Sequence, residues 1–155
     1  MKALVIFDSV FGNTGQIARA IGGAIAVETR PVDEVTPEML TGLEVLIVGS
    51  PTRGFRPTEG ISKFLDSLAR TQLKGVSVAA FDTRIDLQTI DSSVFRFIVD
   101  KGGYAANTIA KQLKNKGGQE VIPAEGFLVT GEQGPLKDGE LVRAAAWAQE
   151  AVQTA

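Results

Sequence analysis

The chain of 155 residues contains no cysteine and no histidine. The absence of cysteine excludes disulfides, thiolate catalysis, iron–sulfur clusters and cysteine-based zinc sites. The absence of histidine removes the usual general base and the commonest metal ligand, so a Ser-His-Asp mechanism is impossible. Any catalysis would rest on carboxylates, lysine, tyrosine or an imported cofactor. These absences therefore favour cofactor chemistry over side-chain chemistry.

The sequence also has little net charge and no long hydrophobic run. Its formal net charge is -2, so bulk charge indicates neither a nucleic acid nor an anionic membrane as a partner. No apolar run approaches the roughly 20 residues that span a bilayer. Met1-Lys2-Ala3 leads into a predicted strand without the pattern of a signal peptide. We therefore expect one domain, residues 1–155, in a cytoplasmic protein that contacts neither membrane nor nucleic acid.

Apolar strands and amphipathic helices alternate along the whole chain. Buried strands are predicted at 3–7, 45–48, 76–81 and 127–129, and an exposed edge strand at 27–32. Helices with one apolar face are predicted around 17–24, 61–68, 106–113 and 141–152, with a short helical turn from Thr36. We expect Trp147, in the last helix, to be a core residue. This order predicts a doubly wound, five-stranded parallel sheet, order 2-1-3-4-5, with helices on both faces.

Ligands of such a sheet bind beyond the carboxyl ends of the strands. The loop 9–14 lies there and joins a buried strand to a helix N-terminus, where free backbone N–H groups and the helix dipole favour an anion. Ser9 and Thr14 can add hydroxyl donors, and Gly12 lets the backbone close around a phosphate. Neither the P-loop pattern nor the dinucleotide glycine pattern is present. The residues alone leave phosphate binding and ordinary helix capping open.

Two further loops are predicted at the same edge of the sheet. The loop 50–57, Ser-Pro-Thr-Arg-Gly-Phe-Arg-Pro, is either a plain turn-rich connection or a ligand loop with a flexible Gly54 beside Phe55. The third loop begins at Asp82, and its stretch from Arg84 to Gly103 is too apolar for a solvated loop. That stretch is a lid over the site, a partner surface, or an element packed on the sheet edge. We prefer the last interpretation.

Two motifs, Phe7-Asp8-Ser9-Val10-Phe11-Gly12-Asn13-Thr14 and Gly49-Ser50-Pro51-Thr52-Arg53-Gly54, resemble the flavin loops of the flavodoxin family. Phe127-Leu128-Val129 with Gly131 and Gly134-Pro135 resembles the end of flavodoxin domains, so the resemblance covers nearly the whole chain. It implies a noncovalently bound FMN and a role in electron transfer. It also implies that the phosphate is held by Ser9, Val10, Phe11, Gly12, Asn13 and Thr14. The ribityl chain and one side of the ring would be lined by Pro51, Thr52, Arg53, Gly54 and Phe55. The polar edge of the ring would meet a third loop that begins with Asp82, Thr83 and Arg84.

Within this resemblance, Gly54 is the candidate for a backbone peptide that flips to accept a hydrogen bond from the reduced flavin. Glycine makes such a flip cheap because both signs of φ are open to it.

The chain also departs from the family pattern. Family members usually place a tryptophan or tyrosine against the flavin, whereas the only tryptophan here, Trp147, lies in the last helix. Tyr104 could reach the flavin, but we expect it to cap a helix or pack at the surface instead. Many flavodoxins are strongly acidic, whereas this chain is nearly balanced and carries Arg53, Arg56 and Arg84 in the loops assigned to the ring. This local positive charge favours a less negative reduction potential.

Three functions are consistent with the sequence. The preferred one is an FMN-dependent electron carrier that serves redox partner proteins. The second is a flavoenzyme of the NAD(P)H-quinone reductase type, which the Pro51-Thr52-Arg53 motif supports. The third is a flavin-free flavodoxin-like interaction domain. The sequence leaves the electron donor, the acceptor and the oligomeric state open.

Overall fold

The computed structural model describes residues 1–86 and 103–155. Its strands are β1 (Ala3–Phe7), β2 (Glu28–Pro31), β3 (Val45–Pro51), β4 (Ser77–Ile85), β5 (Gln119–Glu120) and β6 (Glu125–Val129). Its α-helices are α1 (Asn13–Ile25), α2 (Glu59–Ser67), α4 (Ala105–Asn115) and α5 (Glu140–Gln153). Two short 3-10 helices, η1 (Val32–Glu34) and η2 (Pro37–Leu40), follow β2.

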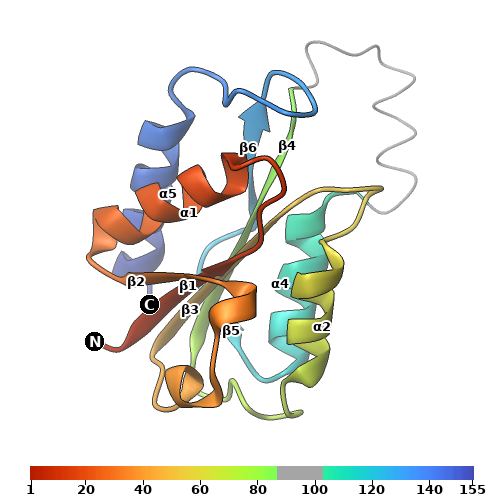
Figure 1. The fold of residues 1–155 in the computed structure, drawn as a ribbon. Coiled ribbons are helices and arrows are strands. Elements are labelled where there is room, and N and C mark those ends of the chain that lie inside the picture. The colour runs from red at the N-terminus through yellow and green to blue at the C-terminus, as the bar shows by residue number, and fades with distance from the viewer. Residues whose placement is uncertain (87–102) are drawn as a thin grey trace.

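The strands form one parallel sheet in the order β2-β1-β3-β4-β5, which confirms the predicted topology. Helices α1 and α5 cover one face of this sheet, and α2 and α4 cover the other (Figure 1). The carboxyl ends of β1, β3 and β4 therefore meet at one edge of the sheet. In the two described ranges, no helix has the length and apolar character needed to cross a membrane.

The fifth position of the sheet is shared by two strands, where the sequence predicted one. Both β5 and β6 pair with β4: Val78 lies opposite Glu120, and Phe81 lies opposite Glu125. The two β4 residues between these points face the four residues 121–124, which include Pro123. Proline has no N–H to donate to a sheet ladder, so the pairing is interrupted there and resumes at β6.

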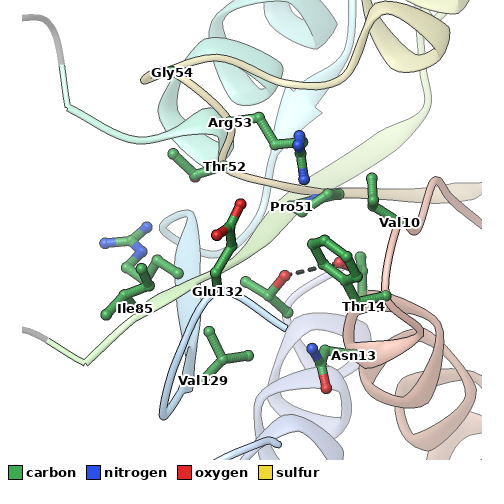
Figure 2. A pocket seen from close by; sticks show the side chains of 13 residues that line it. Val10, Asn13, Thr14, Pro51, Thr52, Arg53, Gly54, Ile85, Val129 and Glu132 are labelled. Carbon is green, nitrogen blue, oxygen red and sulfur yellow. Dashed lines mark hydrogen bonds between the residues drawn. The ribbon is translucent and has the colours of Figure 1, made fainter. Parts of the chain in front are cut away.

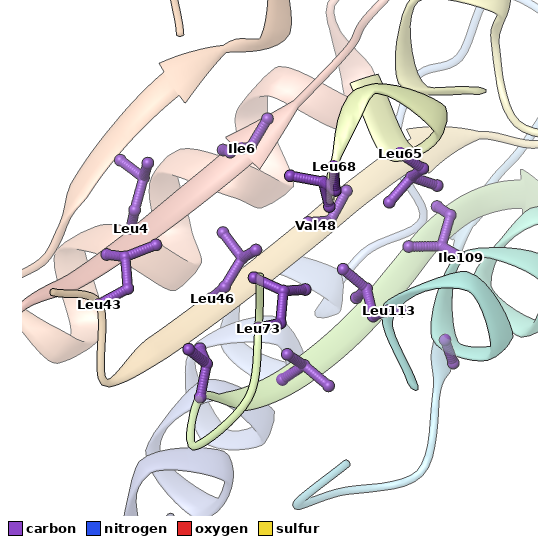
Figure 3. Close-up of a cluster of buried hydrophobic side chains, with 14 of the residues drawn as sticks. Leu4, Ile6, Leu43, Leu46, Val48, Leu65, Leu68, Leu73, Ile109 and Leu113 are labelled. Carbon is purple, nitrogen blue, oxygen red and sulfur yellow. The ribbon is translucent and has the colours of Figure 1, made fainter. Parts of the chain in front are cut away.

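Two apolar cores lie on the two faces of the sheet. On the α2 and α4 side, Leu46 and Val48 of β3 face Leu65 of α2 and Ile109 of α4 (Figure 3). On the α1 and α5 side, the Trp147 ring packs edge-to-face against two rings of the sheet, Phe81 at 6.2 Å and Phe127 at 6.0 Å between centroids. The prediction that Trp147 is a core residue is thus confirmed.

The outer edge of β6 is closed by two charged side chains of α5. The Glu140 carboxylate accepts a hydrogen bond from the Leu128 N–H at 2.7 Å, and Arg143 donates to the Gly126 carbonyl at 2.6 Å. Burial raises the pKa of Glu140, but its bonds to Arg143 and to the Leu128 N–H outweigh burial and hold the pKa below its ordinary value. The edge strand beside the site is thereby kept from pairing with other chains.

Candidate functional site

A cavity of about 320 Å³ lies at the carboxyl ends of the strands, where the sequence placed the site. Ten of the residues that line it were predicted as site residues: Val10, Phe11, Asn13, Thr14, Pro51, Thr52, Arg53, Gly54, Thr83 and Arg84. Figure 2 shows that their side chains converge from the β1, β3 and β4 ends of the sheet. Four predicted residues do not line the cavity: Ser9, Gly12, Phe55 and Asp82. The cavity falls in the size range of small-molecule and cofactor sites.

The loop between β1 and α1 is organised around the Ser9 hydroxyl. Its oxygen accepts hydrogen bonds from the N–H groups of Gly12, at 3.1 Å, and Gly15, at 3.3 Å. Gly12 precedes the helix with φ of 94°, a left-handed conformation that glycine adopts without strain. In the part of the chain that the structure describes, the N–H groups of Asn13 and Thr14 donate no hydrogen bond. The helix N-terminus therefore retains donors for an anion.

Thr14 and Asn13 connect this loop to two other parts of the site. The Thr14 hydroxyl oxygen lies 2.7 Å from that of Thr83 on β4, and both side chains are buried. The Asn13 amide donates to the Gln133 carbonyl at 3.1 Å, in the loop after β6. Three separate strand ends are thus held in one arrangement around the start of α1.

Asp8 joins the first loop to the second. One of its carboxylate oxygens accepts from the Ser9 N–H at 2.9 Å, and the other accepts from the Thr58 hydroxyl at 2.6 Å. Thr58 is also the N-cap of α2, where its oxygen accepts from the Ile61 N–H. This carboxylate thereby fixes the spacing between the two loops that the sequence assigned to phosphate and ring.

The second loop folds into a tight two-residue turn between Arg53 and Arg56. Each of these residues donates its N–H to the carbonyl of the other, at 2.9 and 3.0 Å. Between them, Gly54 has φ of 55° and Phe55 has φ of 68°. Positive φ at both central residues defines a type I′ turn, which is uncommon for a bulky aromatic residue. The left-handed conformation of Gly54 is compatible with the predicted peptide flip, which stays a prediction.

Arg53 points from this turn into the cavity (Figure 2). Its guanidinium carbon lies 5.7 Å from the centroid of the Phe11 ring, a cation–π contact between the first and second loops. Among the described residues, no carboxylate lies within ion-pairing distance of Arg53 or Arg56. Arg53 therefore forms no ion pair within the described ranges.

The prediction that Asp82, Thr83 and Arg84 begin a loop is wrong, because β4 continues to Ile85. The Asp82 side chain is fully buried and receives two hydrogen bonds from Arg84, both of 2.7 Å, and one from the Ala106 N–H. Alternation along the strand places Asp82 and Arg84 on one face of the sheet and Thr83 on the other. Thr83 and Arg84, which lie nearer the end of the strand, line the cavity, whereas Asp82 does not. The stretch from Arg84 to Gly103 was interpreted from its sequence as an element packed on the sheet edge. Most of this stretch, residues 87–102, lies outside the described ranges, so that interpretation stays a prediction.

Arg84 is held between Asp82 and the Tyr104 ring, whose centroid lies 3.6 Å from the guanidinium carbon. Burial raises the pKa of Asp82 above its ordinary value, although the Arg84 guanidinium, the Ala106 N–H and the Thr52 hydroxyl all oppose this. Burial likewise raises the pKa of Tyr104. Tyr104 thus packs over Arg84, as a packing residue rather than as a side chain that lines the cavity.

Three lining residues were not predicted from the sequence: Ile85, Val129 and Glu132. Val129 ends β6 and Glu132 lies in the loop that follows, so a fourth strand end contributes to the site. Figure 2 shows the Glu132 carboxylate directed into the cavity. The glycines Gly131 and Gly134 after the last strand were the available signal for a loop at this edge. No group of three acidic residues in the described ranges could hold a metal ion.

Comparisons with known proteins show the fold. No family model matches the chain. An uncharacterized protein from Methanocaldococcus jannaschii is 29% identical over 75 residues, which are 48% of this chain and 50% of that protein. The match therefore spans about half the length of that relative.

Among solved structures, a flavodoxin from the domain Archaea has a TM-score of 0.75 and 23% identity, with 99% of each chain covered. Flavodoxin 1 from Bacillus cereus has a TM-score of 0.76 and 21% identity over 100% of this chain and 99% of that one. A rubredoxin oxygen:oxidoreductase from Desulfovibrio gigas has a TM-score of 0.75 and 15% identity over 99% of this chain and 36% of that one. The chain therefore has the flavodoxin fold.

Proposed function

We propose that this chain, which has the flavodoxin fold, is a member of the flavodoxin family that binds FMN noncovalently and transfers electrons. The observation that carries the proposal is the cavity, because it lies at the switch point of the sheet and begins at a helix N-terminus with free donors. A cytoplasmic location and redox proteins as partners belong to the same proposal.

The residues present fit the parts of FMN. At the start of α1, the Ser9 hydroxyl, the free N–H groups and Gly12, whose missing side chain leaves open space, are suited to a phosphate. Pro51, Thr52 and Gly54 form a wall with one hydroxyl and one flexible peptide, which suits a polyhydroxy chain and the edge of a planar ring.

When bound, FMN would supply one- and two-electron redox chemistry. The first loop would bind its phosphate through hydroxyl and backbone donors. The second loop would orient the ring, and the carbonyl of the Gly54 peptide would accept a hydrogen bond from the N–H group of the reduced form. The buried Thr14 and Thr83 pair would keep water from the junction between the start of α1 and the end of β4.

The proposal is tested by the absorption spectrum of the purified protein, followed by release and identification of the cofactor. We expect a band near 450 nm, and FMN as the released compound. If neither the purified protein nor protein incubated with FMN shows bound flavin, the proposal is wrong and the flavin-free interaction domain is favoured.

Turnover of NAD(P)H with a quinone distinguishes the electron carrier from the remaining alternative, a flavoenzyme of the quinone reductase type. An electron carrier is expected to show no such steady-state turnover without a separate reductase. Catalytic oxidation of NAD(P)H by the loaded protein would favour the quinone reductase type of flavoenzyme instead.

The reduction potential of the bound flavin is expected to depend on Arg53. Reduction to the anionic form adds negative charge, and a unit positive charge at roughly 8 Å, with an effective dielectric constant near 40, favours that form by about 1 kcal/mol. Because 100 mV corresponds to about 2.3 kcal/mol per charge, Arg53→Gln should lower the potential by about 40 mV in a potentiometric titration at saturating FMN.

Arg84 is not expected to act in the same way, because the buried Asp82 carboxylate neutralises it. Arg70→Gln removes the same charge from an exposed residue in the segment that follows α2, and it serves as the control. Equal potentials for Arg53→Gln, Arg70→Gln and the wild type would show that Arg53 does not face the ring.

A further inference from the structure

The rim of the cavity at the 53–56 turn carries two arginines on the same side. Arg53 and Arg56 are directly opposite one another in the hydrogen-bonded turn, and opposed residues of an antiparallel pair project to one face. Like charges in this position destabilise the pair. Both side chains are exposed, and among the described residues neither meets a carboxylate. Within the described part of the chain, the turn therefore presents two positive charges without an ion-pair partner.

Three large apolar side chains surround the same opening. Val10 is 48% exposed, Phe11 is 43% exposed and Ile85 is 40% exposed, and all three line the cavity. Half of the exposed large hydrophobic residues in the described ranges thus lie at one opening. Phe11 also contacts Arg53, so the apolar and cationic parts of the rim are continuous. Exposed aromatic residues and arginine are the types enriched at the centres of protein interfaces.

We propose that this rim, formed by Val10, Phe11, Arg53, Arg56 and Ile85, is the docking surface for an acidic redox protein. The inference rests on the proposed FMN function, because the cavity that the rim surrounds would hold the flavin. The net charge of the whole chain is -2, so bulk charge alone would favour a basic partner. The local charge at the opening has the opposite sign, and it is the local charge that an approaching partner meets at short range.

A small anion accounts for less of the rim than a protein does. It would use the two guanidinium groups but would leave Val10, Phe11 and Ile85 exposed. Arg56 does not line the cavity, so an anion held by both arginines would lie outside it. An acidic protein surface with apolar residues covers both parts of the rim. Transient electron-transfer interfaces are small and depend on charge for their association rates.

A carboxylate of the loop after β6 orients such a partner. Glu132 lines the same cavity, and Asp86, next to Ile85, is paired with Lys137 at 2.9 Å. An acidic group of the partner is therefore attracted to the 53–56 turn and repelled from Glu132. This asymmetry selects one orientation of the partner over the opening.

The first test uses two haem proteins of opposite charge as electron acceptors, oxidised cytochrome b5, which is acidic, and oxidised cytochrome c, which is basic. The reduced FMN-loaded protein is mixed with each acceptor at low and at high salt. We expect added salt to slow electron transfer to cytochrome b5. Arg56→Glu should reduce the ratio of the cytochrome b5 rate to the cytochrome c rate by about fivefold or more.

Arg70→Glu is the matched control, since it makes the same charge change in the segment that follows α2 and leaves the opening intact. It should leave the ratio of the two rates unchanged. An equal change of the ratio in Arg56→Glu and Arg70→Glu, or no change in either, overturns the proposal.

A second measurement does not need the flavin. Cytochrome b5 is added to the isotope-labelled protein without cofactor, and amide shifts are followed by NMR. We expect the shifts to concentrate at residues 10, 11, 56 and 85, and to disappear in Arg56→Glu. Shifts located elsewhere overturn the proposal, as does an Arg56-dependent dimer in ultracentrifugation, which would place a second copy on the rim. Failure to bind FMN would remove electron transfer in every arm but would not affect this measurement.

Discussion

Replacing Arg84 with alanine is expected to reduce the free energy of unfolding by about 3–5 kcal/mol, because it leaves a buried carboxylate without its partner. The Asp82 side chain is 0% exposed and that of Arg84 is 19% exposed, so the carboxylate depends on the guanidinium rather than on bulk water. The Tyr104 ring over Arg84 would lose its contact as well. Urea denaturation of the variant beside the wild type measures the loss.

The pH dependence of the same variant identifies the cause. Burial already raises the pKa of Asp82 in the presence of Arg84, and removal of the guanidinium takes away a group that lowers it. A carboxyl whose pKa is higher in the folded protein than in the unfolded chain favours folding when it is protonated. The loss of stability in Arg84→Ala should therefore shrink as the pH falls, and grow as the pH rises through the folded-state pKa. An equal loss at pH 5 and at pH 8 would contradict this explanation.

Two further variants separate the ion pair from simple packing. Asp82→Asn combined with Arg84→Met removes both charges, so it should recover most of the stability that Arg84→Ala loses. Gly126→Ala disturbs the ion pair from the neighbouring strand β6, since a Cβ at this position would clash with the Arg84 Nε at 2.0 Å. It should displace the guanidinium and reproduce the pH dependence of Arg84→Ala. A Gly126→Ala protein with wild-type stability would show that Arg84 can reach Asp82 by another path.

This ion pair also explains an error of the sequence analysis. Asp-Thr-Arg after the apolar run 76–81 has the composition of a loop, so the strand was expected to end there. In the structure β4 continues to Ile85, because Arg84 neutralises Asp82 and Gly126 on β6 leaves space for the guanidinium. Both conditions depend on residues that are distant in the sequence, and no local pattern reveals them.

The long strands and the helices could be predicted from the sequence because periodic apolar patterns determine them. Strands β1, β3 and β4 contain continuous apolar runs, and each of the four helices repeats its apolar residues over several turns. A two-residue strand such as β5 carries none, and its pairing with β4 depends on where Pro123 interrupts the ladder. The fifth strand position was therefore predicted, but its division into β5 and β6 was not.

The parts of the site that carry a local sequence signal were predicted, and the others were missed. Hydroxyl residues, a glycine and the start of a helix indicated the first loop, and proline and glycine indicated the second. Residues of both loops line the cavity. Glu132 was missed, because a single carboxylate in a short loop has no pattern until the fold carries that loop to the cavity. The Phe11 and Arg53 contact was missed for the same reason, since the two residues come from different loops.

The affinity for FMN is expected to depend on the Thr14 hydroxyl. A hydroxyl has one donor and two acceptor positions, so the Thr83 hydroxyl can donate to Thr14 and leave the Thr14 hydrogen for the phosphate. A hydrogen bond to a charged group contributes about 1.5–3 kcal/mol, and 1.4 kcal/mol corresponds to a tenfold change in Kd. Thr14→Val, which keeps the shape of the side chain, should therefore weaken FMN binding about tenfold or more in a fluorescence titration.

Riboflavin and Thr83→Val are the controls for this prediction. Riboflavin lacks the phosphate, so it should bind the wild type and Thr14→Val with similar affinity. Thr83→Val breaks the same 2.7 Å contact from the other side but removes no donor to the phosphate, so it should change FMN affinity much less. If Thr14→Val weakens FMN and riboflavin equally, or if Thr83→Val weakens FMN as much, the hydroxyl pair supports the shape of the site and the phosphate is held by the Ser9 hydroxyl and the backbone donors of the first loop.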